Sequence, residues 1–184
     1  MLSFTDREFW TLVHGMGFGA LYLLAFAGGV AGLYSLRPEL LTIVGIKERL
    51  VRLRWGAVLM AVLVWLTVIV GTYVVYPEYR AKPPADIDAT VQSEELRDYP
   101  RSWLKAGEDT APLHEFGMEW KEHVIWIAPM LATVIAYAIF RYREELAQNK
   151  QARWMIVAFF ILSFTIAGVG GVLGALVTKA APLT

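Results

Sequence analysis

The chain has 184 residues, of which 57% are hydrophobic, and its 17 basic and 17 acidic side chains leave a net charge of zero. This composition is typical of membrane proteins and excludes the strongly basic balance of a nucleic-acid-binding domain. With no cysteine, disulfides, thiolate metal sites and CxxCH haem attachment are excluded as well.

Four intervals without charged residues divide the chain. A helix needs about 20 apolar residues to cross roughly 30 Å of hydrocarbon, and every interval is close to that length or longer. Runs such as "GAVLMAVLVWLTVIVGTYVVY" do not alternate as β-barrel strands do. We therefore predict an all-α fold, an integral membrane four-helix bundle that forms a single domain over residues 1–184. The expected spans are 9–36, 55–76, 120–140 and 154–178.

The first span contains His14 about two helical turns from its start, followed at once by Gly15, Gly17 and Gly19. Its apolar run is too long for a cleavable signal peptide and follows "TDRE" without a basic segment, so we expect it to stay in the protein.

An extramembrane loop of about 40 residues, 77–119, separates the second and third spans. It is too small and polar for a core of its own. Because Tyr99, Trp103 and Leu104 give it something to bury, we expect an ordered cap on the bundle. In "EDTAP", Asp109 or Thr110 is the expected N-cap of a third helix that begins outside the membrane.

The segment "LHEFGMEWKEHVIWIAP" holds the other two histidines. His114 and His123 are nine residues apart, so on a regular helix they point in opposite directions and do not share a metal ion. His123 instead shares a stripe with Glu119 and Glu115, which is also what a solvated helix face would show.

Several enzyme motifs fail on spacing. "HEFGM" has methionine where HExxH needs its second histidine, and the residues three before each histidine are not the glutamates of a di-iron ExxH motif. No nucleophile elbow or phosphate-binding loop stands in a usable context.

A planar cofactor fits the pattern better. Haem b held by imidazoles from two helices needs two histidines at similar depth, and His14 and His123 are the pair that qualifies. Small residues such as Gly17 and Gly171 would leave room for the macrocycle, and Arg7 would face its propionates. Glu119 or Glu115 would orient an imidazole, while His114 would lie beyond the ligands.

Other interpretations stay open. Met16 and Met118 allow a His/Met ligand set, and the same region would also suit copper, a quinone or a proton path. The histidines and glycines are equally compatible with plain helix packing in a cofactor-free accessory subunit of a larger membrane complex.

Orientation follows from the basic residues near the spans. Nine of the 17 Lys and Arg side chains lie in the two short segments 37–54 and 141–153, whereas acids exceed basic residues in the long loop. We therefore expect a multi-pass protein of a bacterial inner membrane with the loop and both termini outside.

The layout of four spans with histidines on separate helices resembles the small membrane-anchored b-type cytochromes, which include the haem-bearing anchors of respiratory complexes. That resemblance implies a haem near the outer face, with His14 and His123 as ligands. It also implies electron transfer between a quinone or membrane partner and an outer redox protein, in contact with other membrane subunits or a second copy. The phrases "WTLVHGMGFGALYLLAFAGG" and "HEFGMEWKEHVIWIAP" also resemble an uncharacterised family of bacterial four-span proteins, which implies no activity.

Overall fold

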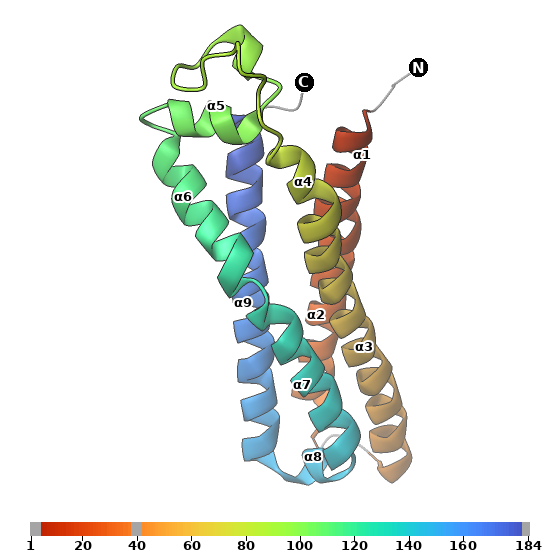
Figure 1. Cartoon of the computed structure of the whole chain (residues 1–184). Coiled ribbons are helices and arrows are strands. Elements are labelled where there is room, and N and C mark those ends of the chain that lie inside the picture. Colours follow the sequence, from red (N-terminus) through yellow and green to blue (C-terminus); the bar gives the residue numbers. More distant parts are fainter. Residues whose placement is uncertain (1–4, 38–41, 182–184) are drawn as a thin grey trace.

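The computed structural model describes residues 5–37 and 42–181, and this part of the chain is helical with no strand. Four helices are long and apolar enough to cross a membrane, and they run side by side in alternating directions (Figure 1). The predicted all-α bundle of four membrane helices is thereby confirmed. The helices cover Asp6–Ser35, Ile43–Tyr79, Ala111–Tyr142 and Lys150–Ala180.

The first long helix comprises α1 (Asp6–Leu12), a π-helical segment η1 (Val13–Phe18) and α2 (Gly19–Ser35). Thr5 caps its start: the Thr5 hydroxyl accepts from the Glu8 amide, and the Glu8 carboxylate accepts from the Thr5 amide at 2.8 Å. This capping box satisfies amides that have no partner within the helix.

The second long helix comprises α3 (Ile43–Val70), the π-helical segment η3 (Gly71–Val75) and α4 (Tyr76–Tyr79). It begins at Ile43, well before the expected residue 55, because Thr42 caps it by accepting a hydrogen bond from the Gly45 amide at 3.2 Å. Charged residues end an apolar span but do not end a helix.

The third long helix comprises α6 (Ala111–Glu119), the π-helical segment η5 (Trp120–Val124) and α7 (Ile127–Tyr142). Thr110 is its N-cap residue and Pro112 lies in its first turn, as predicted. The helix thus starts nine residues before the span expected at 120–140. A short helix α8 (Glu145–Gln148) then leads to α9 (Lys150–Ala180), whose N-cap Asn149 accepts from the Ala152 amide.

The long helices pack in a closed ring, α2 on α3, α3 on α7, α7 on α9 and α9 on α2. The main core fills the half of the bundle farther from the cap. The buried hydroxyl of Ser163 is hydrogen-bonded in this core. It donates to the carbonyl of Ala128 at 2.9 Å and lies 3.1 Å from the Tyr22 hydroxyl. These bonds join α2, α7 and α9 without leaving a buried hydroxyl unpaired.

Residues 80–110 form the cap, which contains the 3₁₀ turn η4 (Glu94–Leu96) and the helix α5 (Pro100–Ala106). Leu104 is fully buried in a small cluster with Met118 and Val177, and Trp103 donates to the Ala180 carbonyl at 3.1 Å. The loop is therefore an ordered cap, as expected. The main helix of the cap is α5.

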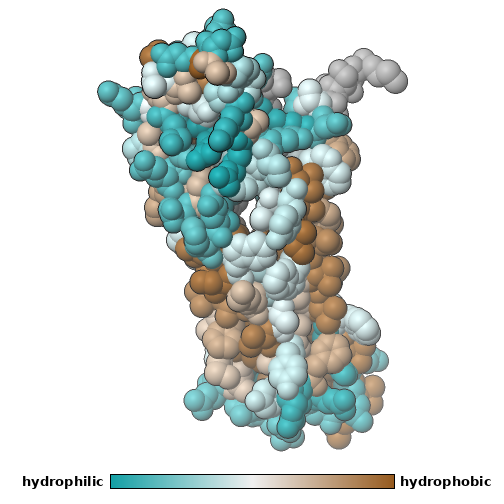
Figure 2. Space-filling model, in the orientation of Figure 1, coloured by the Kyte–Doolittle hydropathy of each residue, from teal (hydrophilic) through white to brown (hydrophobic). Residues whose placement is uncertain are grey.

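Three of the four long helices meet the cap at one end of the bundle, here called the cap end; the opposite end, with α8, is the basic end. Figure 2 shows an apolar band across the middle of the molecule and hydrophilic residues at both ends. Toward the cap, α6 leans away from α4 while it stays on α9, so the helices separate into two pairs (Figure 1).

Candidate functional site

All three π-helical segments lie in the cap-end half of their helices. Pro77 follows η3 and Pro129 follows η5. A proline has no amide hydrogen, so the carbonyl four residues before it loses its helical hydrogen bond. A wider turn near the proline accommodates the missing bond. In η1 the same widening occurs in the glycine-rich stretch "VHGMGF". Such segments are frequent at functional sites, and these three place His14, Gly71 and Lys121 at one end of the bundle.

The His14 imidazole packs on the backbone of Gly71. A Cβ added to Gly71 would lie 2.6 Å from Cε1 of His14 and 3.1 Å from its Nδ1, closer than side chains tolerate. The ring also lies near the backbone carbonyl of Thr67. Only a glycine at position 71 leaves the imidazole its place between the first two helices.

His14 Nδ1 is buried and has no hydrogen-bond partner among the described residues. It is the one buried side-chain nitrogen or oxygen of which this is true in residues 5–37 and 42–181. Buried polar atoms are nearly always paired, and leaving one unpaired costs about 1–3 kcal/mol. An exception inside an apolar bundle is therefore a candidate binding position.

Lys121 approaches the same region from η5. Its Nζ lies 3.2 Å from where a Cβ on Gly174 would be, so the ammonium sits against the backbone of α9. Its charge acts on the His14 imidazole. No ion pair joins Lys121 to an acid in the described part of the chain. An imidazole from the first long helix and an ammonium from the third thus interact electrostatically.

His123 has a different environment. Its side chain is 67% exposed, and its Nδ1 lies 3.3 Å from the Glu119 carboxylate and 3.3 Å from the Glu119 carbonyl. The predicted pairing of Glu119 with His123 is present. His123 therefore lies on the outside of its helix, whereas His14 lies between helices.

His114 is buried and belongs to a polar layer beneath the cap. Its Nδ1 lies 2.6 Å from the hydroxyl of Tyr79, and the two rings are stacked. Nearby, the hydroxyl of Tyr76 donates to the carboxylate of Glu122. These two hydrogen bonds join α4 to α6 and η5.

The remaining predicted residues have ordinary surroundings. The charge of Arg7 interacts with the carboxylates of Glu78 and Asp98. A Cβ added at Gly171 would meet nothing within 4 Å, and one at Gly17 would meet only Val13 of its own helix at 3.9 Å. In this half of the long helices, Gly71 and Gly170 have close neighbours instead, and a Cβ added to Gly170 would lie 2.6 Å from Ile125. Glu115 is exposed.

The expected haem ligands can be compared with this geometry. Axial ligation needs two imidazoles that face each other across the ring. One of the two expected histidines lies between helices and the other is turned outward to Glu119, so they do not form such a pair. Among the described residues, no three His, Asp or Glu side chains gather as metal ligands.

No family model, no curated protein and no solved structure matches the chain. The site must therefore be judged on its own chemistry.

The sequence-based choice of His14 selected the residue with the unusual environment, but it did not select Gly71 or Lys121. Pro77, directly after the second expected span, and Pro129, inside the third, are the signals that would have pointed to these neighbours, because each breaks regular helical hydrogen bonding.

Proposed function

We propose that the protein is a multi-pass protein of a bacterial inner membrane that binds a quinone-type headgroup in the cap-end half of the bundle, between His14 and Lys121. The cap and both termini lie on the outer side in this proposal, because nine of the 17 basic residues belong to the two segments at the basic end.

The unpartnered Nδ1 of His14 carries the proposal. A quinone ring offers carbonyl oxygens, and a quinol offers hydroxyls, so an imidazole nitrogen pairs with either form of the headgroup. Lys121 adds an ammonium with three N–H donors, which suits a second ring oxygen. Both groups come from the membrane-spanning part of the chain, where lipid-soluble ligands are dissolved.

The origin of the two groups supports this choice. His14 belongs to the first long helix and Lys121 to the third, and the charge of Lys121 acts on the imidazole. A flat ring needs a few convergent polar groups of this kind. Haem would need a facing axial pair in addition.

The polar layer beneath the cap supports a role that exchanges protons. Tyr79 with His114 lies on the cap side of the proposed site, and Tyr76 is bonded to Glu122, the residue next to Lys121. Quinone and quinol differ by two protons as well as two electrons, and hydrogen-bonded side chains of this type are common in proton relays. The proposed partner is an outer redox protein, because the proposed site lies in the half of the bundle nearer the cap, which is the outer side in this proposal.

Titration of the purified full-length protein in detergent tests the proposal. A short-chain quinone analogue should quench tryptophan fluorescence in a saturable way, because Trp120 lies beside Gly170 near the site. His14→Leu should weaken binding roughly tenfold, the usual value of one buried hydrogen bond. His123→Leu is the matched control and should bind like the wild type.

Equal binding by wild type and His14→Leu would reject the quinone site. If neither protein binds at all, the cofactor-free accessory subunit becomes the better interpretation.

Haem b is the second candidate, and it stays a prediction. The observation that favours it is again His14, a histidine in a membrane helix whose Nδ1 has no hydrogen-bond partner among the described residues. A reduced-minus-oxidised absorbance spectrum of the same purified sample decides between the candidates, since only haem gives a Soret band. The haem candidate is rejected if the sample stays colourless after haem is supplied.

A further inference from the structure

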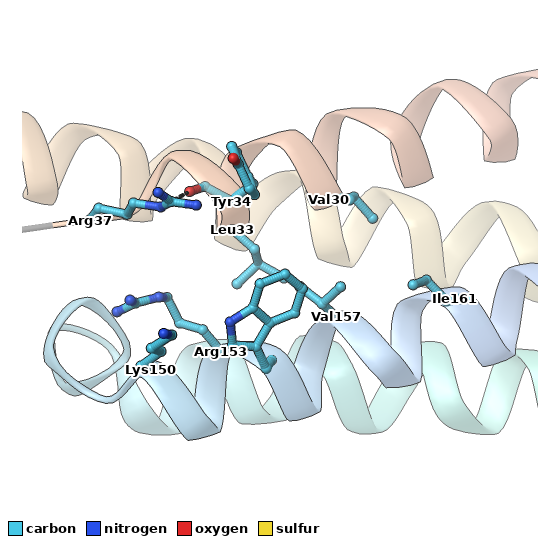
Figure 3. A pocket seen from close by; sticks show the side chains of 9 residues that line it. Val30, Leu33, Tyr34, Arg37, Lys150, Arg153, Val157 and Ile161 are labelled. Carbon is cyan, nitrogen blue, oxygen red and sulfur yellow. Dashed lines mark hydrogen bonds between the residues drawn. The ribbon is translucent and has the colours of Figure 1, made fainter. Parts of the chain in front are cut away.

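A groove at the basic end lies between α2 and α9 (Figure 3). It has a volume of about 700 Å³, far more than the voids of a packed interior. Arg37 extends from the end of α2 on one side, and Lys150 and Arg153 extend from the start of α9 on the other. Three cations thus surround one opening, and none of its lining residues is acidic.

Two of these cations are held in place by backbone carbonyls. Arg37 donates from Nε to the Tyr34 carbonyl at 3.2 Å, and its guanidinium lies over the Tyr34 ring. Arg153 donates to the Leu146 carbonyl at 2.8 Å. Each guanidinium has five N–H donors, so most of them remain available for a ligand. Within residues 5–37 and 42–181, no ion pair neutralises Arg37, Lys150 or Arg153.

The walls of the groove are apolar and lead toward the middle of the membrane. Val30 and Leu33 line it from α2, and Val157 and Ile161 line it from α9. From Lys150 to Ile161 the lining of α9 extends roughly 16 Å along the helix axis at 1.5 Å per residue. Trp154, which is 53% exposed, also lines the groove about one helical turn from Lys150, and aromatic rings favour the membrane interface.

We propose that this groove is a binding site for an anionic phospholipid, with the phosphate between Arg37, Lys150 and Arg153 and one acyl chain along the apolar walls. Basic pockets between membrane helices suit negatively charged headgroups. A zwitterionic lipid fits less well because it would bring a fourth positive charge among three cations. The apolar walls favour a lipid over a free phosphate, which would leave them empty.

Native mass spectrometry of the full-length protein in detergent tests this site, with phosphatidylglycerol and phosphatidylcholine as probes. The wild type should retain phosphatidylglycerol in preference to phosphatidylcholine. The double variant Arg37→Gln/Lys150→Gln should weaken phosphatidylglycerol binding roughly tenfold or more. Each cation near an anionic headgroup contributes to the binding free energy of the lipid. Arg153 is left unchanged because it also holds α8.

The matched control is Lys47→Gln/Arg141→Gln, which removes two exposed cations from the same end but outside this groove. It should bind phosphatidylglycerol within about twofold of the wild type, on the reasoning that surface charge alone acts weakly. An equal loss in both double variants would overturn the proposal, because the attraction would then be general. If the double variant fails to fold, Lys150→Gln against Lys47→Gln gives the same comparison.

Two further outcomes would also overturn it. One is equal retention of phosphatidylcholine and phosphatidylglycerol by the wild type. The other is displacement of the lipid by millimolar inorganic phosphate, which would identify the ligand as a soluble anion. Lipid retention that resists phosphate and depends on Arg37 and Lys150 supports the site.

Discussion

The imidazole of His14 and the backbone of Gly71 are in such close contact that a single methyl group on Gly71 would lie 2.6 Å from Cε1 of the ring. This contact fixes the position of the imidazole between the first and second long helices. It also leaves Nδ1 of the same ring without a partner among the described residues.

Gly71→Ala should destabilise the protein. An added methyl in a packed site costs about 1–3 kcal/mol, more than the roughly 1 kcal/mol that alanine gains over glycine as a helix former. Gly56→Ala, on the same long helix with nothing within 4 Å of an added Cβ, is the control and should not destabilise. Thermal unfolding in detergent measures both. In a His14→Ala background the penalty of Gly71→Ala should largely disappear, and a penalty that persists there would locate the clash elsewhere.

His14→Leu should stabilise the ligand-free protein. In the wild type, the buried and unpaired Nδ1 lowers the free energy of unfolding by about 1–3 kcal/mol, and the leucine removes this penalty. The unfolding temperature without added quinone should therefore rise, while quinone binding falls. A lower unfolding temperature for this variant would mean that the imidazole contributes more through packing than its unpaired atom costs.

Tyr79→Phe should destabilise the polar layer beneath the cap. The hydroxyl of Tyr79 lies 2.6 Å from Nδ1 of His114, and its removal leaves a buried imidazole nitrogen unpaired at a cost of about 1–3 kcal/mol. Tyr137→Phe is the control because Tyr137 is 68% exposed. The difference between the two unfolding temperatures is the measurement, and no difference would contradict the role assigned to this bond.

Leu104→Ala should release the cap from the bundle. Leu104 is fully buried against Met118 and Val177, and truncation of such a residue costs about 2–5 kcal/mol. In the wild type, trypsin should cleave slowly at Arg97, Arg101 and Lys105, and Leu104→Ala should accelerate this cleavage. Val91→Ala, at a position that is 59% exposed, should not. Rapid cleavage of the wild type would contradict this prediction, because it would show that the cap is not held on the bundle by Leu104.

Orientation in the membrane is tested by a reporter fused after Thr184. The basic residues at the end opposite the cap predict that a reporter active only outside the cytoplasm will work there. Activity of a cytoplasmic reporter instead would reverse the orientation and place His14 on the inner side.

The sequence by itself determined the architecture. Long intervals without charge permit only helices in a membrane, because every backbone polar group must be satisfied within its own segment. The four long helices confirm this, and Thr110 and Pro112 marked the start of the third helix correctly. Helix bounds at 43 and 111 were not readable from apolar spans, since a helix continues past the membrane wherever a cap residue starts it earlier.

Only the tertiary structure decided which residues meet. Spacing along a regular helix placed His14 and His123 at similar depth, yet three π-helical segments change the rotation of their helices, and helical phase cannot be counted through them. His123 is therefore turned outward to Glu119, while Gly71 and Lys121 are the neighbours of His14. The basic groove likewise depends on the packing of α2 beside α9, which brings Arg37 opposite Lys150 and Arg153 from more than a hundred residues away in the chain. Hydropathy and charge are properties of single segments, whereas these contacts depend on how the segments are rotated and packed against one another.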